Sequence, residues 1–449
     1  MNVPVRRVKA RATTTIELSR SRYDVRLPEG FVQLFYGDGR PIRLANEYMY
    51  GRTIALLRAR KPWAKTQSAL ADDLAQATIF LHLLGLKWDD ISRTVVEQYS
   101  VALTAGYSVW TQKKRSPSTI HRRMTTLVDA CRFGFEKGYI SSDIVGSSPR
   151  PVSTFLRGSR TPDNISHDEL EVVLPRRLAP DARVNPILHL RAILDALGSE
   201  SPAPGAPRRD RLAAETTLFT GLRVDETAGL TVYQILHLAE KMERNANWRE
   251  LRLELDASRT KGGVGGSVLI PCFHINALVN YIDGERTEIV NYARDIQGRA
   301  YIETPSLFLN GIGCNHRDIG KPCRPETFSR AFTRAVLACN LTRREERLVL
   351  NPDGSIVRDA AGTILTEWVD CAAHDFHDLR HTFAVTQYIV RKANGERDPL
   401  KSVQTLLRHK LSQTTIDIYL RWLSVYERDF SAELSRHYRK LDGWAEGKR

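Results

Sequence analysis

The chain has 449 residues and is 42% apolar, which is enough to bury more than one hydrophobic core, so we expect two domains behind an N-terminal extension. Lysine and arginine total 66 against 52 acidic residues, and the resulting formal charge of +14 favours a polyanionic partner, nucleic acid before any other. The six cysteines form no Cys-x-x-Cys pair and the chain has neither an apolar signal peptide nor a membrane-length apolar run, which argues against a disulfide framework, secretion and a membrane partner and predicts a cytoplasmic protein.

Residues 1–45 carry no pattern that assigns them a role, and we treat them as an N-terminal extension. From about Asn46 onward the apolar residues recur at helical spacing, which predicts a helical domain over residues 46–150. Ser92 is the expected N-cap of one of its helices. Another helix is expected to end at Gly85 and to bury one face, made of Leu70, Leu74, Ala77, Leu81 and Leu84.

A third helix of this domain is expected to begin at Ser116, because a capping residue followed by Pro117 is a typical helix start. Its apolar positions from Ile120 to Phe135 recur with helical spacing, so the basic residues near its beginning face elsewhere. A basic helix start suits phosphate contact, although a merely solvated cationic face is an equally good interpretation. The candidate DNA-binding residues are Lys113, Lys114, Arg115, His121, Arg122 and Arg123.

Turn-forming residues at 147–151 predict a linker, and a second domain is expected over residues 160–449. The sequence from Ser166 to Glu169 is a capping box that predicts a helix start there. Alternating apolar residues at 251–255 and 268–270 predict an antiparallel hairpin, and turn chemistry near Asn351 predicts a surface hairpin between residues 340 and 370. Together these patterns predict a mainly α protein with a small antiparallel β-sheet.

Two blocks of the second domain place cationic side chains at turns. In Gly221-Leu222-Arg223, the glycine can end a helix in the left-handed conformation and present the arginine at a sharp corner, where its guanidinium can fork onto phosphate oxygens. Glu226 could orient this arginine or cap the next turn, although a surface ion pair at a helix end is an equally good interpretation. Lys261 lies in the turn of the predicted hairpin and could protonate a leaving oxygen, whereas most lysines in polar turns have no such role.

A third block, residues 374–384, is rich in histidine. If it is helical, His377 and Arg380 share a face, so that an imidazole and a guanidinium can point at one phosphate. A zinc site of His374, His377 and His381 is disfavoured, because no acidic ligand is obvious and an arginine lies among them. No metal is expected from the other candidate set either, because its spacing is irregular: Cys314, His316 and Cys323.

The fourth block carries His409 and, after a short turn, Tyr419. A single tyrosine near a C-terminus is usually a packing residue with its hydroxyl at the surface. Here it follows three blocks of side chains suited to a phosphodiester, which favours a nucleophilic phenol instead.

In this order, the four blocks resemble those of the tyrosine recombinase (phage integrase) family, and residues 116–123 resemble a helix of that family's core-binding domain. The resemblance implies a helical, SAM-like core-binding domain followed by an α+β catalytic domain. It also implies that Arg223 and Arg380 clamp a scissile phosphate and that Tyr419 attacks it to form a 3′-phosphotyrosine. The other implied roles are proton donation by Lys261, help in proton transfer by His377, a phosphate hydrogen bond from His409, and support by Glu226 and His381.

The sequence also departs from the family pattern. Arg408 stands where many members have glycine before the histidine, and the segments near 176–210 and 340–372 are longer than usual. The catalytic set itself is complete. Two arginines and two imidazoles can neutralise a phosphate without a metal, and a phosphotyrosine conserves the bond energy, so no cofactor is expected.

The resemblance implies double-stranded DNA as the partner and a homotetramer on two DNA sites, with accessory proteins as further candidates. It implies a bacterial or phage-encoded, nucleoid-associated protein of a mobile element or phage. A helix from Val425 to Leu441 could pack on a neighbouring subunit or on its own domain. Two alternatives stay open: a type IB topoisomerase that relaxes DNA as a monomer, and a DNA-binding regulator that has lost catalysis.

Overall fold

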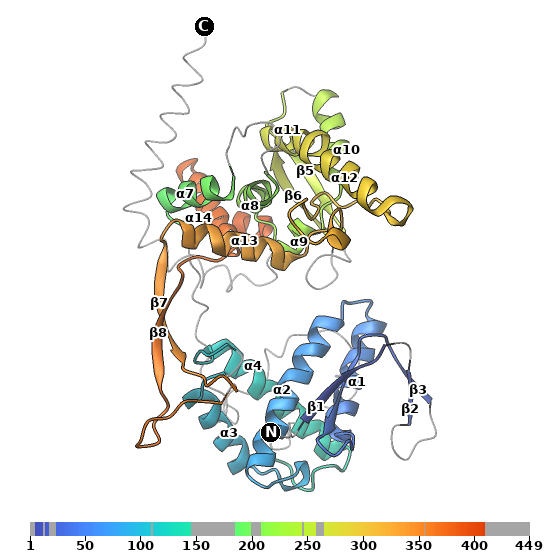
Figure 1. Ribbon diagram of the computed structural model, residues 1–449, viewed down its shortest axis with the longest axis vertical. Coiled ribbons are helices and arrows are strands. Elements are labelled where there is room, and N and C mark those ends of the chain that lie inside the picture. The colour runs from blue at the N-terminus through green and yellow to red at the C-terminus, as the bar shows by residue number, and fades with distance from the viewer. Residues whose placement is uncertain are drawn as a thin grey trace. The chain divides into compact units, whose positions relative to one another are not determined.

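The structure is a computed structural model that describes residues 5–11, 14–17, 24–108, 111–144, 185–198, 208–244, 247–256, 265–353 and 355–408. The chain divides into two compact units, a first unit of Met1–Leu178 with Glu346–Val369 and a second unit of Ala179–Glu345 with Asp370–Arg449. Helices predominate in the described residues, and the strands there form two-stranded sheets (Figure 1). The predicted mainly α fold with small antiparallel β-structure is therefore confirmed.

The N-terminal part of the first unit contains strands followed by helices. Its strands are β1 (Val5–Lys9), β2 (Thr14–Glu17), β3 (Asp24–Leu27) and β4 (Val32–Tyr36), with β1 antiparallel to β4 and β2 antiparallel to β3. Its helices are α1 (Arg43–Arg58), α2 (Ala64–Leu83), the short 3-10 helix η1 (Trp88–Asp90), α3 (Arg93–Ala105) and α4 (Pro117–Glu136). The two predicted N-caps are confirmed, because the hydroxyls of Ser92 and Ser116 accept the backbone N–H groups of Val95 and Thr119.

Apolar spacing predicted the buried faces of α2 and α4 well except at their last turns. In α2 the predicted residues are buried up to Leu81, but Leu84 is 45% exposed because it is the C-cap and the chain turns away at Gly85, whose φ is 71°. In α4 they are buried from Ile120 to Cys131, whereas Phe135 is 41% exposed. Periodicity therefore identifies a helix face but does not show where neighbouring elements stop covering it.

Strands β1 and β4, with Leu27 of β3, share one hydrophobic core with the helices of the first unit. Two buried side-chain amides fix β4 in place. The amide of Asn46 bonds both backbone groups of Leu34, at 2.8 and 2.9 Å, and that of Gln67 bonds both backbone groups of Val32, at 3.1 and 2.7 Å. Because an isolated strand pair is marginally stable, we infer that these amides stand in for a neighbouring strand. The N-terminal extension is thus structurally part of the helical unit.

The second unit is built mainly from helices. They are α7 (Ile187–Leu197), α8 (Arg209–Thr220), α9 (Val224–Ala228), α10 (Val232–Arg244), α11 (Cys272–Tyr281), α12 (Thr287–Gln297), α13 (Pro325–Ala338), α14 (Asp378–Ala393) and α15 (Pro399–Leu406). Short helical segments are the π-type η3 (Ile282–Arg286) and the 3-10 helices η4 (Gly298–Ala300) and η5 (His316–Asp318). Helix α8 is central, because it packs against α7, α13, α14 and the strand β6 (Gly266–Pro271) (Figure 1).

The predicted hairpin of the second unit is confirmed. Strands β5 (Glu250–Leu255) and β6 (Gly266–Pro271) pair antiparallel, with Leu251 opposite Ile270 and Leu253 opposite Val268. All four of these side chains are buried, which explains the alternating pattern in the sequence.

The hairpin predicted between residues 340 and 370 is also confirmed, since β7 (Thr342–Leu348) and β8 (Thr366–Ala372) pair with one another. Residues 346–369 of this hairpin belong to the first unit although they lie between helices of the second. The backbone N–H of Leu348 donates to the carbonyl of Gln112 at 2.8 Å, and Lys114 lies 3.3 Å from the Glu346 carboxylate. This inserted segment therefore completes the first unit.

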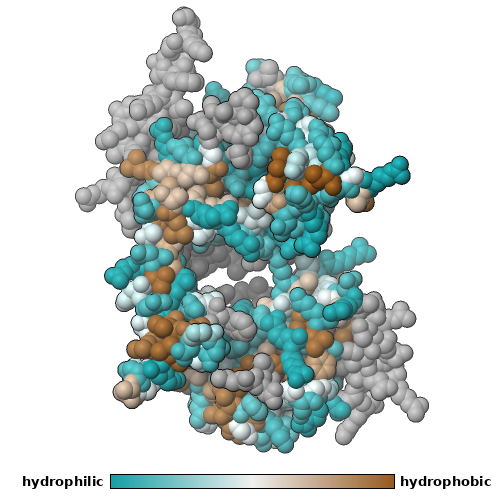
Figure 2. Space-filling view, in the orientation of Figure 1, coloured by the Kyte–Doolittle hydropathy of each residue, from teal (hydrophilic) through white to brown (hydrophobic). Residues whose placement is uncertain are grey.

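The surface agrees with the charged composition. The face seen in Figure 2 is mostly hydrophilic, with apolar patches scattered over it. In the part of the chain that the structure describes, no helix has the length and apolar character needed to cross a membrane. All six cysteines, each in a described segment, are free thiols.

One buried histidine makes the stability of the second unit sensitive to acid. His274 of α11 is 1% exposed, its Nε2 lies 2.8 Å from the Thr216 hydroxyl, and burial lowers its pKa to about 3. The unfolded chain protonates this ring near pH 6.5, so the native state loses stability as pH falls below that value.

We expect the wild type to lose about 2 kcal/mol between pH 7 and pH 5 through His274 alone. Urea unfolding of the wild type and of His274→Gln at both pH values measures this loss. The variant lacks the titrating ring, so its own decrease should be smaller by that amount. Parallel pH dependences in the two proteins would contradict the prediction.

Candidate active site

The first predicted block forms the corner that the sequence indicates. Helix α8 ends at Gly221, which has φ 66° and ψ 18°, and Arg223 then serves as the N-cap of α9. A Cβ on Gly221 would lie 2.5 Å from the ring of Phe383 in α14. Glycine is therefore required here twice, by the backbone conformation and by the close approach of α14.

Gly221→Ala is expected to destabilise the protein by about 3 kcal/mol, through left-handed strain plus overpacking against Phe383. Denaturant unfolding measures the loss. A matched control is Gly85→Ala, because Gly85 also follows the end of a helix with a positive φ, 71°, but nothing lies within 4 Å of the position of its added Cβ. Equal losses in the two variants would mean that contact with Phe383 adds nothing.

Glu226 holds Arg223 at this corner both by capping the helix start and by orienting the guanidinium, the two roles that the sequence suggests. One carboxylate oxygen accepts the backbone N–H of Arg223 at 2.9 Å, and the other accepts its guanidinium at 3.1 Å. Arg408 adds a second guanidinium, 2.6 Å from the carboxylate. Burial by itself raises the pKa of Glu226, but the Arg223 backbone N–H and the two guanidinium groups outweigh it and lower the pKa. The carboxylate therefore stays ionised between two arginines.

Arg380 of α14 connects three segments that are far apart in the sequence. Its side chain is 2% exposed, and it donates hydrogen bonds to the carbonyl of Gly221 and, at 2.6 Å, to that of Leu407. The ends of α8 and α15 are thus fastened to the beginning of α14. In this state Arg380 is a structural anchor, and its predicted contact with a phosphate stays a prediction.

His377 lies beside this anchor, as the spacing of the third block predicts. It is the N-cap of α14, and its ring is 4.7 Å from that of the buried His381, edge to face. Desolvation by the surrounding protein lowers the pKa of His377, and the positive charges of Arg380 and then Arg223 lower it further, against the opposing effect of Asp375. A neutral imidazole at neutral pH can accept a proton.

The histidine-rich block shows no metal-binding arrangement. His374 Nε2 lies 3.1 Å from Nδ1 of His189, and its Nδ1 lies 3.7 Å from the carboxylate of Asp378. No group of three histidine, cysteine, aspartate or glutamate side chains within the described segments is arranged to hold a metal ion. His374 therefore links α14 to α7.

Three of the predicted catalytic residues, Lys261, His409 and Tyr419, lie outside the described residues, as does the helix expected from Val425 to Leu441. The described chain stops at Asp256 before the first of them and at Arg408 before the other two.

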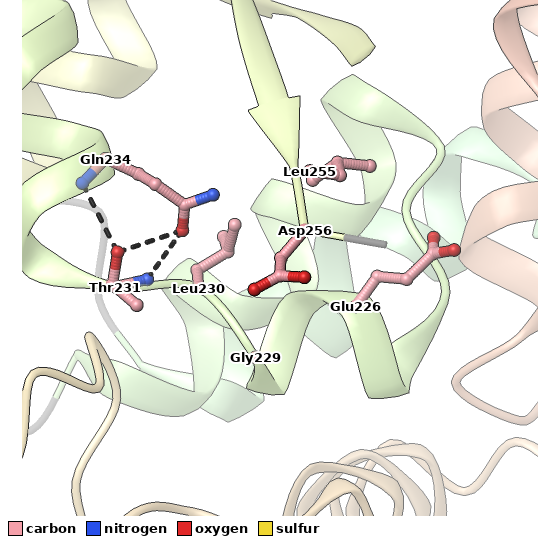
Figure 3. A pocket seen from close by; sticks show the side chains of 7 residues that line it. All are labelled: Glu226, Gly229, Leu230, Thr231, Gln234, Leu255 and Asp256. Atoms are coloured by element: carbon pink, nitrogen blue, oxygen red, sulfur yellow. Dashed lines mark hydrogen bonds between the residues drawn. The ribbon is translucent and has the colours of Figure 1, made fainter. Parts of the chain in front are cut away.

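A pocket of about 280 Å³ is lined in part by Glu226. Figure 3 shows Glu226 from α9 and Asp256 from the end of β5 among its lining residues, with Thr231 and Gln234 bonded to each other. Among the described residues, its lining has two carboxylates and no lysine, arginine or histidine. Arg223 presents a guanidinium to the same Glu226, so the corner at Arg223 is the candidate anion site.

The basic residues predicted to contact DNA differ in how much surface they offer. The Lys114 side chain is 61% exposed beside Glu346, and that of Arg122 is 46% exposed, 2.5 Å from the buried Asp73. The Arg123 side chain is only 13% exposed and lies 3.6 Å from the same carboxylate. Lys114 and Arg122 are therefore better placed for a phosphate than Arg123. The remaining candidates have intermediate exposure: Lys113, Arg115 and His121.

Two residues beside the candidate site residues are not predictable from the sequence, Asp73 and Arg408. Asp73 lies 49 residues from its partner Arg122, and its sequence context is that of any polar residue in a helix. Arg408 was noticeable only as a departure from the glycine that the resembling family often has. Its φ of 54° is in the left-handed region, where glycine is the residue without strain.

No protein-family model and no curated protein sequence matches the chain. Among solved structures, it is similar to a lambda integrase(75-356) dimer bound to a COC′ core site, with a TM-score of 0.43 and 16% identity, over 84% of this chain and 94% of that one. It is also similar to the Tn1549 transposon integrase (residues 82-397) in complex with circular intermediate DNA, with a TM-score of 0.42 and 15% identity over 83% and 94% of the chains. A third similar structure is the XerH site-specific recombinase bound to palindromic difH substrate. Its TM-score is 0.41 and its sequence identity is 14%, over 77% of this chain and 72% of that one.

Proposed function

We propose that this protein is a site-specific tyrosine recombinase that cleaves and rejoins DNA through a 3′-phosphotyrosine on Tyr419. The observation that carries the proposal is the convergence around Arg380. Its two carbonyl partners, Gly221 and Leu407, are 159 and 27 residues away in the sequence. They adjoin Arg223 on one side and the segment that leads to His409 on the other. The first and third blocks and the described residues just before His409 therefore meet around Arg380, which supports the proposal.

The proposed reaction needs only side chains of this protein. The Tyr419 oxygen forms a bond to phosphorus, the bond from phosphorus to the 5′ oxygen breaks, and Lys261 protonates the departing oxygen. Arg223, Arg380 and His409 stabilise the additional negative charge on the phosphoryl oxygens. The lowered pKa of His377 supports its role as acceptor of the phenol proton. A 5′ hydroxyl from a second strand then attacks the phosphotyrosine, rejoins the DNA and releases the phenol.

Arg380 also holds the backbone at this point, because it donates to the carbonyls of Gly221 and Leu407. A guanidinium carries five N–H donors in a fixed fork. Its bonds to these carbonyls therefore do not by themselves prevent a contact with the scissile phosphate.

We propose further that the first unit contacts double-stranded DNA through Lys114, Arg122 and the neighbouring basic residues, as a core-binding domain. A homotetramer on two DNA sites would carry out the exchange, in the cytoplasm and on the nucleoid of a host for a phage or mobile element. Accessory proteins could direct the choice between integration and excision.

The proposal is tested with a duplex selected for binding from a random pool and nicked beside the cleavage position, so that religation is prevented. The expected product is a denaturant-resistant protein–DNA adduct, and peptide mapping should locate it at Tyr419. Strand exchange between two such duplexes, without relaxation of plasmid that lacks the site, would separate a recombinase from a type IB topoisomerase. Binding without any adduct would indicate a regulator and would refute the proposal.

A further inference from the structure

Arg408 has an unusual conformation for its residue type. It follows the C-cap of α15 with φ 54°, and its backbone N–H donates to the carbonyl of Thr405 at 3.0 Å. A non-glycine residue in this region costs about 1 kcal/mol. Glycine would adopt the same turn without that cost, so the turn itself does not need the side chain of Arg408, and any contribution of that side chain lies in its contacts.

That contribution is visible in the contacts of the side chain. The guanidinium of Arg408 lies 2.6 Å from Glu226, with 17% of the arginine side chain and 2% of the glutamate side chain exposed. Its aliphatic part lies against β6, since a Cβ added to Gly266 would be 2.9 Å from Cδ of Arg408. The residue therefore connects the end of α15 to α9 and to the beginning of β6.

The ion pair also changes the charge at the Arg223 corner. A carboxylate paired with a single guanidinium forms a neutral pair. The Glu226 carboxylate is paired with both Arg223 and Arg408, so the group of three has a net charge of +1. Buried Glu226 is thereby neutralised without taking up the whole charge of Arg223, whose side chain remains 24% exposed. The exposed charge of Arg223 is then available to an anion.

We propose that Arg408 is a positioning residue that, through Glu226, holds Arg223 in the geometry needed for cleavage. This inference rests on the proposed function. It goes beyond it, because nothing in the resemblance to a known family assigns a role to an arginine at this position.

Arg408→Gly is the informative variant, because it keeps the turn, relieves its strain and removes only the side chain. Single-turnover cleavage of the nicked duplex at saturating DNA is expected to slow by about 10- to 100-fold, the effect of a small misplacement of catalytic groups, with DNA affinity unchanged. Arg408→Lys should recover most of the rate, because only one nitrogen of the guanidinium contacts Glu226 and the Nε has no hydrogen-bond partner.

Arg60→Gly is the matched control. Arg60 has φ 51° and is exposed, so this change also removes one positive charge and the same backbone strain. It should leave cleavage unchanged. A wild-type rate for Arg408→Gly would overturn the inference, and so would an equal loss of DNA affinity and rate, since that would make Arg408 a DNA contact.

The pair itself can be tested without DNA. The losses in the free energy of unfolding of Arg408→Gly and Glu226→Gln should not add up in the double variant, because both single changes break the same Arg408–Glu226 contact. Urea unfolding of the three variants measures these losses. Additive losses would overturn the inference whatever the protein does to DNA. By contrast, a wild-type protein that forms no adduct would refute the proposed function, and with it any role of Arg408 in cleavage.

Discussion

Tyr419→Phe is expected to form no covalent adduct with the nicked duplex and to lose cleavage by at least about 10⁴-fold, the order lost when an enzyme is deprived of its nucleophile. Phenylalanine retains the ring but has no oxygen to bond to phosphorus. Because only a hydroxyl is removed, DNA affinity and the denaturation midpoint should stay at wild-type values. Gel analysis of denatured reaction mixtures measures the adduct and cleavage, a parallel titration measures DNA affinity, and denaturant unfolding measures the midpoint.

Tyr388→Phe provides the control for this substitution. Tyr388 is a partly buried residue of α14 that packs against the small core cluster formed with α15. Loss of its hydroxyl should leave the adduct yield unchanged. If Tyr419→Phe still became linked to DNA, the nucleophile would have to be another residue, and Tyr426 and Tyr438 would be the next tyrosines to replace.

The sequence predicts the structure correctly at features that depend on residues close to one another in the chain. The left-handed Gly221, the serine caps of α3 and α4 and the alternation that buries one face of β5 each follow from residues within a few positions of one another. Caps, turns and alternation are local effects, because they depend on backbone conformation and on one buried face.

The remaining features depend on partners that are distant in the sequence. Glu226 and Arg408 are 182 residues apart, and the periodicity of α9 or α15 contains no information about the other element. Likewise, nothing in residues 1–45 indicates that Asn46 and Gln67 will fix β4 to the helices. The assignment of residues 346–369 to the first unit also depends on contacts across the chain. Such pairings are decided by tertiary packing.

The convergence around Arg380 shows how the two kinds of information combine. Helical spacing in the third block predicted that His377 and Arg380 would lie on one face, and they do adjoin one another at the beginning of α14. It did not predict that Arg380 would be buried and bonded to two backbone carbonyls. A residue selected for its chemistry therefore also carries part of the fold.

Arg380→Met is for that reason expected to affect stability and cleavage together. Methionine fills much of the volume but leaves the carbonyls of Gly221 and Leu407 without this donor, which should cost about 3 kcal/mol. Cleavage should fall by at least about 10²-fold, the usual loss when one stabiliser of a developing negative charge is removed. Urea unfolding measures the first effect, and single-turnover cleavage well below the denaturation midpoint measures the second.

Two further variants separate the structural effect from the chemical one. Arg391→Met makes the same substitution on α14, at a partly exposed ion pair with Glu396, and should cost no more than about 1 kcal/mol with full cleavage. Arg380→Lys keeps a cation that can reach one carbonyl but cannot fork, so it should recover part of the stability and little of the cleavage. If Arg380→Lys cleaved like the wild type, the forked contact with phosphate would be wrong and Arg380 would be an anchor alone.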